Sequence, residues 1–334
     1  MNNPRVASRT FPDTAPRMEY RRLNVEEALP ATTLCEITFG TRRPGTVLAA
    51  GTLSVEVNLP ALVGTGMTEL WHADGKVESG REGLVQFARG SHYLAGKVEI
   101  DEQSVGGLAE AASIAYAAIS RFTVRSGHRH LLRMYNYFSD INAGEGDAER
   151  YKLFCSGRAA GFRELAGPAW PAATAIGRKD HSGVLQVYWL AGDEPGVPLE
   201  NPRQVSAFNY PRQYGPSPPT FSRAMQVAGA MLISGTGSVL GHASHHPDDL
   251  AAQLDEILRN HASLRQAGGL SAASLRGRAT LLKIYLRNAT AAGFVTNYLR
   301  EHLPGHAQFV VLGADICRHE LLVEIDAAYL GPRD

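Results

Sequence analysis

Two carboxylates near the end of the chain could supply acid–base chemistry. Glu324 and Asp326 lie in residues 321–327, where they alternate with apolar residues in the manner of a β-strand. Successive strand side chains point to opposite faces, so both acids share one face while Val323 and Ile325 share the other. A carboxyl that faces a closed cavity keeps its proton to a higher pH, because desolvation disfavours the charged form. The pattern also fits a strand edge that carries two charges in solvent, and the residues alone favour that simpler interpretation.

Cationic chemistry depends almost wholly on arginine. The sequence has 28 arginines against 5 lysines, and its 33 basic residues balance 33 acidic ones. A neutral chain lacks the excess positive charge that nucleic-acid binding requires. Genome composition is the simpler explanation of the arginine excess, but a planar guanidinium also binds carboxylates through two parallel hydrogen bonds. The charge balance therefore argues against nucleic-acid binding, and a small anionic substrate is a hypothesis to test.

Cysteine usage and hydropathy predict a cytoplasmic location. Cys35, Cys155 and Cys317 are scattered without a CxxC spacing, so neither a disulfide framework nor a structural zinc site is expected. Apolar runs such as residues 228–233 are too short to cross a bilayer, and residues 1–22 are polar and arginine-bearing. We expect no signal peptide and no membrane anchor.

Two further patterns suggest ligands and are set aside. His242, His245 and His246 precede a helix start in a spacing that matches no zinc signature. Residues 235–238 resemble a phosphate-binding loop only superficially, because neither GxxxxGK[ST] nor GxGxxG follows. No GxSxG motif marks a serine nucleophile. The sequence therefore predicts chemistry without a metal, a cofactor or a covalent intermediate.

An internal repeat organises the elements that must position these groups. In the first half, apolar residues at helical spacing over 108–122 precede a strand-like run at 130–135. In the second half, an acidic start signal at 247–249 opens a helix with an apolar stripe over 250–258. The run LLKIY at 281–285 then repeats the earlier LLRMY. Two copies of one unit are the economical interpretation.

Short strands complete each copy of the unit. An apolar strand that ends in glycine precedes each helix, at residues 93–96 and 231–235. The second copy closes with two strand candidates at 308–312 and 321–327. The sequence therefore predicts an α+β fold of two similar domains, each a mixed sheet with helices packed on one face.

A Pro-rich stretch separates the two copies. Residues 195–219 are interrupted by prolines and cannot form a long helix or strand. We assign residues 1–165 to the first domain, 166–220 to a connector and 221–334 to the second domain. A plain linker is the alternative, but an ordered connector that contributes to the active site is favoured by the aromatic and cationic residues in and beside it: Tyr210, Arg212, Tyr214, Phe221 and Arg223.

The second copy resembles the YjgF/RidA family. The resemblance is carried by Phe-Ser-Arg-Ala at 221–224, Ile-Ser-Gly-Thr at 233–236, the LLKIY strand and Cys-Arg-His-Glu-Leu-Leu-Val-Glu-Ile at 317–325. It implies the YjgF/RidA, or chorismate-mutase-like, fold for both copies and says less about function, because one fold supports many activities. One departure weakens the deaminase interpretation: where that family has a Pro-x-Arg pattern for the substrate carboxylate, this chain reads Pro304-Gly305-His306.

Segments outside that unit resemble the chorismatases more specifically. They are Asn-Tyr-Phe through Ile-Asn at 136–142, Glu-Arg-Tyr through Ser-Gly-Arg at 149–158, and Asn-Tyr-Pro-Arg-Gln-Tyr-Gly-Pro at 209–216. The resemblance covers about residues 20 to 330. It implies a degenerate first domain, a catalytic second domain and the cleavage of chorismate into pyruvate and a hydroxylated ring acid.

The implied reaction assigns roles to particular side chains. Splitting the enolpyruvyl ether without a metal requires a proton on the vinyl carbon, so one acid must be neutral at the working pH. The resemblance places the catalytic glutamate of the family on Glu324, with Asp326 as its competitor. For each arginine proposed to hold the two carboxylates, a surface ion pair is the alternative. The proposed binding residues lie in segments expected to have little regular structure: Arg150, Arg158, Tyr210, Arg212, Tyr214, Arg223 and, more weakly, Arg318.

Gly237 and Cys317 resemble the pair found in the 3-hydroxybenzoate-forming chorismatases. In that group the ring hydroxyl displaces the ether through an arene-oxide-like intermediate before the ring aromatises. The alternatives are hydrolysis to a dihydroxycyclohexadiene carboxylate, formation of 4-hydroxybenzoate, a RidA-like imine-hydrolysing or ligand-binding protein, and an interaction protein. For Cys317 the alternative is a buried apolar side chain that has no role in product choice. Chorismate is the expected partner, with neither nucleic acid nor membrane, and both a monomer and a homotrimer fit.

Overall fold

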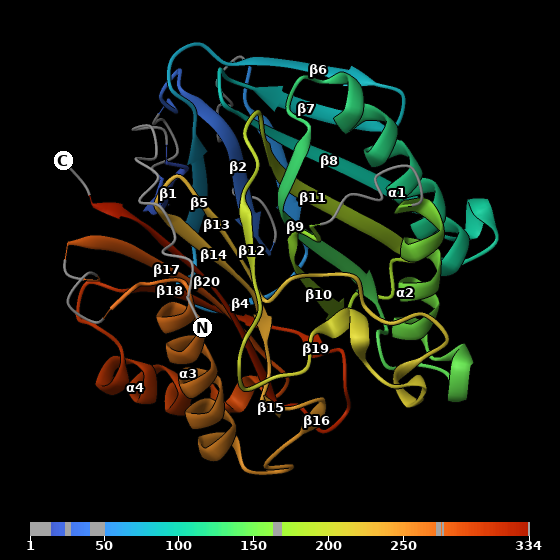
Figure 1. Cartoon of the computed structure of the whole chain (residues 1–334), viewed down its shortest axis with the longest axis vertical. Helices are drawn as coiled ribbons and strands as arrows, with labels where there is room; N and C mark the ends of the chain where they lie inside the picture. The colour runs from blue at the N-terminus through green and yellow to red at the C-terminus, as the bar shows by residue number, and fades with distance from the viewer. Residues whose placement is uncertain are drawn as a thin grey trace, which may run out of the picture.

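A computed structural model describes residues 15–23, 28–40, 51–162, 169–271, 275 and 277–332. Its main elements are two seven-stranded sheets, each of which carries a pair of α-helices on its outer face. In Figure 1 the first sheet and its helices lie at the right, and the second sheet lies at the lower left with its helices beneath it. The inner faces of the sheets approach each other near the middle of the molecule.

The first sheet has the strand order β19-β10-β9-β11-β8-β7-β6. Its strands, in chain order, are β6 (Glu78–Glu82), β7 (Val85–Arg89), β8 (Tyr93–Asp101), β9 (His130–Ser139), β10 (Ala172–Arg178), β11 (Val184–Gly192) and β19 (Asp315–Ile316). Its helices are α1 (Leu108–Arg125) and α2 (Arg150–Gly161). The helices pack against each other through small residues, and a side chain on Gly157 or Gly161 would overlap the backbone of α1.

The second sheet has the order β12-β13-β14-β20-β17-β18-β4. Its strands are β4 (Ala61–Val63), β12 (Val197–Leu199), β13 (Ala224–Val227), β14 (Ala230–Thr236), β17 (Arg278–Leu286), β18 (Gln308–Gly313) and β20 (Val323–Pro332). Its helices are α3 (Leu250–Ala267) and α4 (Ala292–His302). The side chain of Asp249 accepts a hydrogen bond from the Ala252 N–H and caps α3. Among the described residues, no helix is both long and apolar enough to span a membrane.

The predicted duplication is confirmed by the sheet topology. The order β7-β8-β11-β9-β10 in the first sheet corresponds to β13-β14-β20-β17-β18 in the second. In both copies the strands before and after the second helix pair in parallel, β9 with β10 and β17 with β18. The other pairs in these orders are antiparallel. A parallel pair needs a crossover connection, which α2 and α4 supply. The sequence did not predict these two helices.

Strands are exchanged between the two halves of the chain. β4 joins the second sheet beside β18, and β19 joins the first sheet beside β10. A third sheet, which the sequence did not predict, has the order β1-β5-β2-β3, with β1 (Arg17–Arg22), β2 (Thr33–Phe39), β3 (Leu53–Val57) and β5 (Met67–His72). Its side chains share one core cluster with the inner faces of both large sheets. The domain boundaries at 165 and 220 remain a prediction.

Of the predicted connector 166–220, residues 172–192 include β10 and β11 of the first sheet, and only the Pro-rich stretch 195–219 has little regular structure. It contains β12 and two 3-10 turns, Ala207–Asn209 and Arg212–Tyr214. A two-stranded ribbon of β15 (Val239–Leu240) and β16 (Ala243–Ser244) lies on the same side of the molecule, below β14 in Figure 1. The backbone connects the two segments, because the Val205 N–H donates to the Gly241 carbonyl at 2.8 Å and the Gly241 N–H donates to the Arg203 carbonyl at 2.9 Å.

Candidate active site

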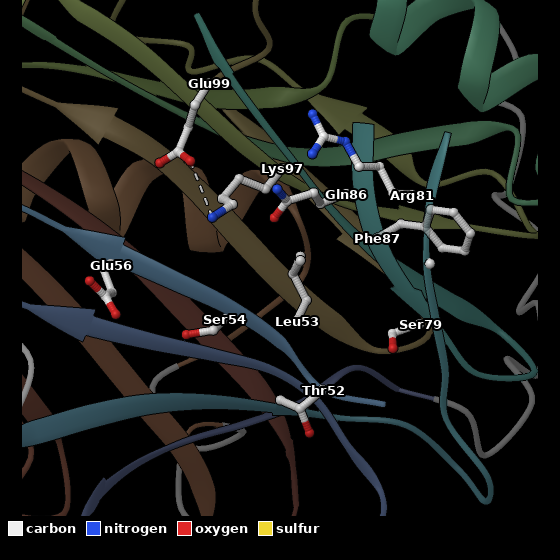
Figure 2. A pocket seen from close by; sticks show the side chains of 11 residues that line it. Thr52, Leu53, Ser54, Glu56, Ser79, Arg81, Gln86, Phe87, Lys97 and Glu99 are labelled. Atoms are coloured by element: carbon white, nitrogen blue, oxygen red, sulfur yellow. Dashed lines mark ion pairs between the residues drawn. The ribbon is translucent and has the colours of Figure 1, made fainter. Parts of the chain in front are cut away.

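One cavity of the described residues lies away from the predicted site residues. A groove of about 590 Å³ runs between β3 and the strands β6, β7 and β8. Figure 2 shows its polar lining, in which Lys97 and Glu99 form an ion pair of 3.3 Å. Gln186 donates to Glu99 from beside the groove at 2.6 Å. None of the residues predicted to bind or convert substrate lines this groove, so it is not the candidate active site.

Two adjoining cavities meet at Glu324. The outer chamber has a volume of about 220 Å³, and the inner chamber has about 40 Å³. Residues from both halves of the chain line both chambers, so the site lies at the junction of the two repeats. The shared residues are Tyr151, Pro219, Phe221, Gly235, Cys317 and Glu324.

The position of Glu324 follows from the centre of the second sheet. β20 lies between β14 and β17, where Glu324 pairs with Tyr285 of β17. On the other side, the register between β14 and β20 shifts between Ile233 and Thr236, which indicates a β-bulge. The bulge opens the ladder beside Glu324, whose residue surface is only 4% exposed. A central strand therefore delivers a carboxyl to the end of a cavity.

Gly235 lies in the bulge and faces the carboxyl. A Cβ on Gly235 would lie 2.0 Å from Oε1 of Glu324, so only glycine leaves room for the carboxyl. The Gly235 N–H leaves the ladder and donates to Oγ1 of Thr174 at 3.0 Å. Nearby, the Ser234 hydroxyl accepts from the Ala173 N–H at 2.9 Å and donates to the Ser222 carbonyl at 2.6 Å. These bonds join β10 of the first sheet to β14 of the second at the site.

Burial and, less strongly, the negative charge of Asp326 raise the pKa of Glu324 to about 8. The guanidinium groups of Arg133, Arg223 and Arg318 oppose that shift without cancelling it. Within the described residues, Glu324 forms no ion pair within 4.0 Å. A buried carboxyl without a dedicated cation keeps its proton at neutral pH.

Asp326 shares the face of Glu324, as the alternation predicted, but of the two acids only Glu324 lines the cavities. Asp326 accepts from the Tyr285 hydroxyl at 2.9 Å and lies 3.3 Å from Nη2 of Arg133 and 3.8 Å from Nζ of Lys283. It lines neither chamber. The competitor for the acid role is therefore held in the core between the sheets.

The charges in that core balance. Lys283 also pairs with Glu69 of β5 at 2.7 Å, so the buried cations Arg133 and Lys283 face the carboxylates Glu69 and Asp326. Burial raises the pKa of Asp326, whereas the nearby Lys283 and Arg133 lower it. Because a buried charge is costly without a partner, two cations require two anions. The carboxylates of Glu69 and Asp326 neutralise the two buried cations, and Glu324 stays uncharged.

Arg158 reaches the inner chamber from α2. Its residue surface is 4% exposed, and the guanidinium lies over the rings of Tyr116 and Phe162 at 5.0 and 5.2 Å. Within the described part of the chain, its buried Nε and Nη2 have no hydrogen-bond partner. A buried guanidinium without an acceptor is expensive, so it marks the place where an anion would bind.

Two more arginines line the outer chamber. Arg223 donates from Nη2 to the Tyr210 hydroxyl at 2.6 Å and to the Val205 carbonyl at 2.8 Å. Arg318 donates from Nη1 to Ser244 at 2.9 Å and to the His242 carbonyl at 3.0 Å. Its guanidinium lies over the rings of Tyr210 and Tyr214. Cationic and phenolic groups therefore meet on one wall, and all four predicted side chains that form it line the chamber: Tyr210, Tyr214, Arg223 and Arg318.

Arg150 and Arg212 lie outside both chambers, contrary to their predicted role. Arg150 begins α2 and pairs with Glu102 at 2.8 Å, and its Nε donates to the Ser139 carbonyl. Arg212 is exposed and donates through both Nη atoms to Asp147, at 2.9 and 2.6 Å. For these two residues the alternative of an ion pair describes the structure. The expectation of irregular backbone also fails for Arg150 and Arg158, which lie in α2.

Gly237, Cys317 and Leu321 line the outer chamber. A Cβ on Gly237 would lie 2.8 Å from Cδ1 of Leu321, so a larger residue there displaces a side chain of the wall. Cys317 also lines the inner chamber, and burial raises its thiol pKa well above the ordinary value. Cys317 is therefore a neutral wall group beside Glu324.

Tyr151 was not predicted as a site residue, although it lines both chambers. Tyr151, Cys155 and Arg158 recur at four- and three-residue intervals on one face of α2. Recognising residues 150–161 as a helix would have brought Tyr151 and Arg158 together on the sequence alone. Gly235 carries no such signal, because its place at the site depends on the joint between the sheets.

The histidine cluster has structural partners. Nδ1 of His242 lies 3.2 Å from the Tyr214 hydroxyl, and Nε2 of His246 lies 3.9 Å from Glu256. Among the described residues, no three His, Cys, Asp or Glu side chains are grouped as metal ligands. His306, at the position where the deaminase arginine would lie, is exposed in the turn before β18.

Comparisons with known proteins identify the family. The model described as Chorismatase FkbO/Hyg5-like, N-terminal, matches residues 69–191. The chain is 34% identical to a chorismatase of Streptomyces rapamycinicus, over 95% of this chain and 98% of that protein. It is 34% identical to a 3-hydroxybenzoate synthase of Streptomyces hygroscopicus, over 83% of this chain and 85% of that protein. A crystal structure of a chorismatase matches with a TM-score of 0.83 at 32% identity, over 95% of this chain and 98% of that chain. The chain belongs to the chorismatase family.

Proposed function

We propose that this chain cleaves chorismate into pyruvate and 3-hydroxybenzoate, with Glu324 as the proton donor. The observation that supports the proposal most is a buried carboxyl, with its pKa raised to about 8, in a cavity that three arginines line. Relatives at 34% identity are named chorismatase and 3-hydroxybenzoate synthase. Chorismate has two carboxylates, which require cations, and an enol ether, which requires an acid.

The first step transfers the carboxyl proton of Glu324 to the terminal vinyl carbon. The vinyl π electrons form the new C–H bond, and the positive charge that develops is shared with the ether oxygen as an oxocarbenium. Glu324 becomes a carboxylate at that moment, and its negative charge stabilises the cation beside it. A raised pKa keeps the acid protonated until the substrate requires the proton.

In the second step the ring hydroxyl oxygen attacks the neighbouring ring carbon that bears the ether. The C–O bond to the side chain breaks, its electron pair leaves with pyruvate, and the hydroxyl proton returns to Glu324. The resulting epoxide opens and the ring loses a proton as it aromatises. Chorismate then divides into pyruvate and 3-hydroxybenzoate without net consumption of water. Hydrolysis differs, since one water is added and a dihydroxycyclohexadiene carboxylate forms.

The arginines divide into an inner and an outer set. Arg158 is the candidate for one carboxylate, because its buried nitrogens lack acceptors among the described residues. Arg223 and Arg318 are candidates for the other, since both line the outer chamber and their donors are only partly used. Holding both ends of the substrate fixes the vinyl carbon relative to Glu324, which is how orientation lowers a barrier.

Gly237 and Cys317 support the choice of 3-hydroxybenzoate over hydrolysis. Both line the chamber that Glu324 also lines, so they border the space in which the ring hydroxyl or a water molecule would attack. The test is incubation with chorismate, with pyruvate followed by coupling to lactate dehydrogenase and the ring product identified by chromatography. We expect pyruvate and 3-hydroxybenzoate in equal amounts. A dihydroxylated diene as the main product would contradict the product assignment, and unconverted chorismate would contradict the function and favour an imine-hydrolysing protein.

A further inference from the structure

Arg287 and Asn142 meet behind the segment that carries Cys317 and Arg318. Arg287 directly follows β17 in the second half of the chain, and Asn142 follows β9 in the first half. Both Nη atoms of Arg287 donate to Oδ1 of Asn142 at 3.2 Å. Nη1 also donates to Oδ1 of Asp315 at 2.9 Å. A contact between the two repeats therefore lies directly against a wall of the active site.

Arg287 also holds the backbone on both sides of Cys317. Nη2 donates to the carbonyls of Ile316 at 3.1 Å and Arg318 at 3.0 Å. Nε donates to the carbonyl of Leu321 at 2.9 Å. A planar guanidinium presents its donors in a rigid fork, so these bonds fix the segment in one geometry.

Asn142 adds a bond that completes the arrangement. Its Nδ2 donates to the Ile316 carbonyl at 2.9 Å, while its Oδ1 accepts from Arg287. The amide therefore orients the guanidinium and holds the same carbonyl that precedes Cys317. Neither Arg287 nor Asn142 lines either chamber, so any effect on the reaction must pass through the segment that they hold.

We propose that Arg287, oriented by Asn142, is a positioning residue that holds Cys317 and Arg318 in the cavity wall and thereby determines the ring product. The inference rests on the proposed function, because it deepens the role of that same site. Two products compete for one activated substrate: the ring hydroxyl attacks within the molecule, whereas hydrolysis requires a water molecule. Small displacements change such competition strongly, since reacting atoms must lie within about 3–3.5 Å.

The test compares Arg287→Lys and Asn142→Ala with the control Arg278→Lys. Arg278 begins the same strand β17 and likewise donates to backbone carbonyls, those of Gly229 at 2.7 Å and Leu330 at 3.3 Å. For the two positioning variants we expect a several-fold larger share of the dihydroxylated diene and a raised KM, because Arg318 is displaced as well. The control should give the wild-type product ratio. Thermal unfolding of all three variants separates loss of fold from loss of position.

A second readout does not depend on the reaction. Cys317 is partly exposed, whereas Cys35 and Cys155 are buried and serve as internal references. Alkylation by iodoacetamide, followed by mass spectrometry of each cysteine peptide, measures how firmly the segment is held. We expect Cys317 to react several-fold faster in Arg287→Lys and Asn142→Ala than in the wild type, and at the wild-type rate in Arg278→Lys.

The two readouts distinguish the possible failures. If the wild type releases no pyruvate, the proposed function fails, and the alkylation rates still decide whether the segment is held by Arg287. Unchanged alkylation in both positioning variants would overturn the proposal. Faster alkylation with an unchanged product ratio would overturn its link to the product. A changed ratio in Arg278→Lys as well would show a general effect of destabilisation and contradict the proposal.

Discussion

Gly235 and Glu324 face each other across the bulge between β14 and β20, and the carboxyl occupies the space where a side chain on Gly235 would lie. A Cβ at that position would be 2.0 Å from Oε1 of Glu324. Oγ1 of Thr174 in the first repeat accepts a hydrogen bond from the Gly235 N–H at 3.0 Å. This bond opposes a shift of the Gly235 backbone that would make room for a side chain. The active site therefore depends on a glycine that contributes space rather than a chemical group.

Gly235→Ala should abolish most of the activity while leaving the fold intact. The added methyl group forces the Glu324 carboxyl out of its place, and a misplaced proton donor loses the contribution of general acid catalysis, about 100- to 10,000-fold. Gly293→Ala in α4 is the matched control, because a Cβ there meets nothing within 4 Å. Pyruvate release by both variants checks the prediction. Equal activity in the two variants would contradict the packing argument.

The rate should fall with rising pH. Glu324 must be protonated to act as the acid, and burial raises its pKa to about 8. The free enzyme is then in its active form below that value, so kcat/KM should decline about tenfold per pH unit above it. A pH profile of kcat/KM from pH 5 to 10 measures the midpoint. A decline of kcat/KM centred near the ordinary pKa of a glutamate would contradict the claim that burial keeps Glu324 protonated at neutral pH.

Stability should respond to the same proton. Between the ordinary pKa of 4.5 and about 8, the folded state keeps a proton on Glu324 that the unfolded state has lost. The wild type therefore loses about 1.4 kcal/mol of unfolding free energy per pH unit in that window, relative to a variant without the titrating group. Urea unfolding of the wild type and Glu324→Gln at pH 5.5 and 7.5 tests this. We expect the amide variant to gain stability relative to the wild type as the pH rises, and a constant difference would count against it.

The arginines should separate by their partners. Arg158→Gln removes a buried guanidinium from the inner chamber, and kcat/KM should fall about 10- to 100-fold, as for the loss of a charge-assisted hydrogen bond. Arg212→Gln breaks only its exposed pair with Asp147, so kcat/KM should stay within about twofold of the wild type. Steady-state kinetics on chorismate decide the matter. A larger loss of kcat/KM in Arg212→Gln than in Arg158→Gln would contradict the assignment of Arg158 to the substrate.

The sequence predicted the repeat because its signals are local and periodic. The helix at 108–122 and the strand at 130–135 appear as α1 and β9, and the matching pair in the second half appears as α3 and β17. The sequence did not predict α2, because the helix face that meets the cavities carries Tyr151, Cys155 and Arg158, which do not form an apolar stripe. The four-stranded sheet escaped for another reason: its strands pair across long loops, which a periodic pattern does not report.

The candidate site was predicted in part for similar reasons. Strand alternation placed Glu324 and Asp326 on one face, but depth along the strand decided their roles, and depth depends on which neighbours surround β20. Lys283 and Arg133 hold Asp326 in the core. Arg150 and Arg212 resembled substrate ligands until Glu102 and Asp147 proved to be their partners. Partners distant in sequence are set by tertiary packing, so residue type alone did not reveal them.

The most direct test of the account is pyruvate release by Glu324→Gln beside the wild type. The amide is close to the carboxyl in size and has no proton to transfer to the vinyl carbon. With unchanged folding by circular dichroism, we expect the wild type to convert chorismate and the variant to release pyruvate at a rate lower by at least about 100-fold. Undiminished release by a folded Glu324→Gln would show that another group protonates the substrate and would contradict the central claim.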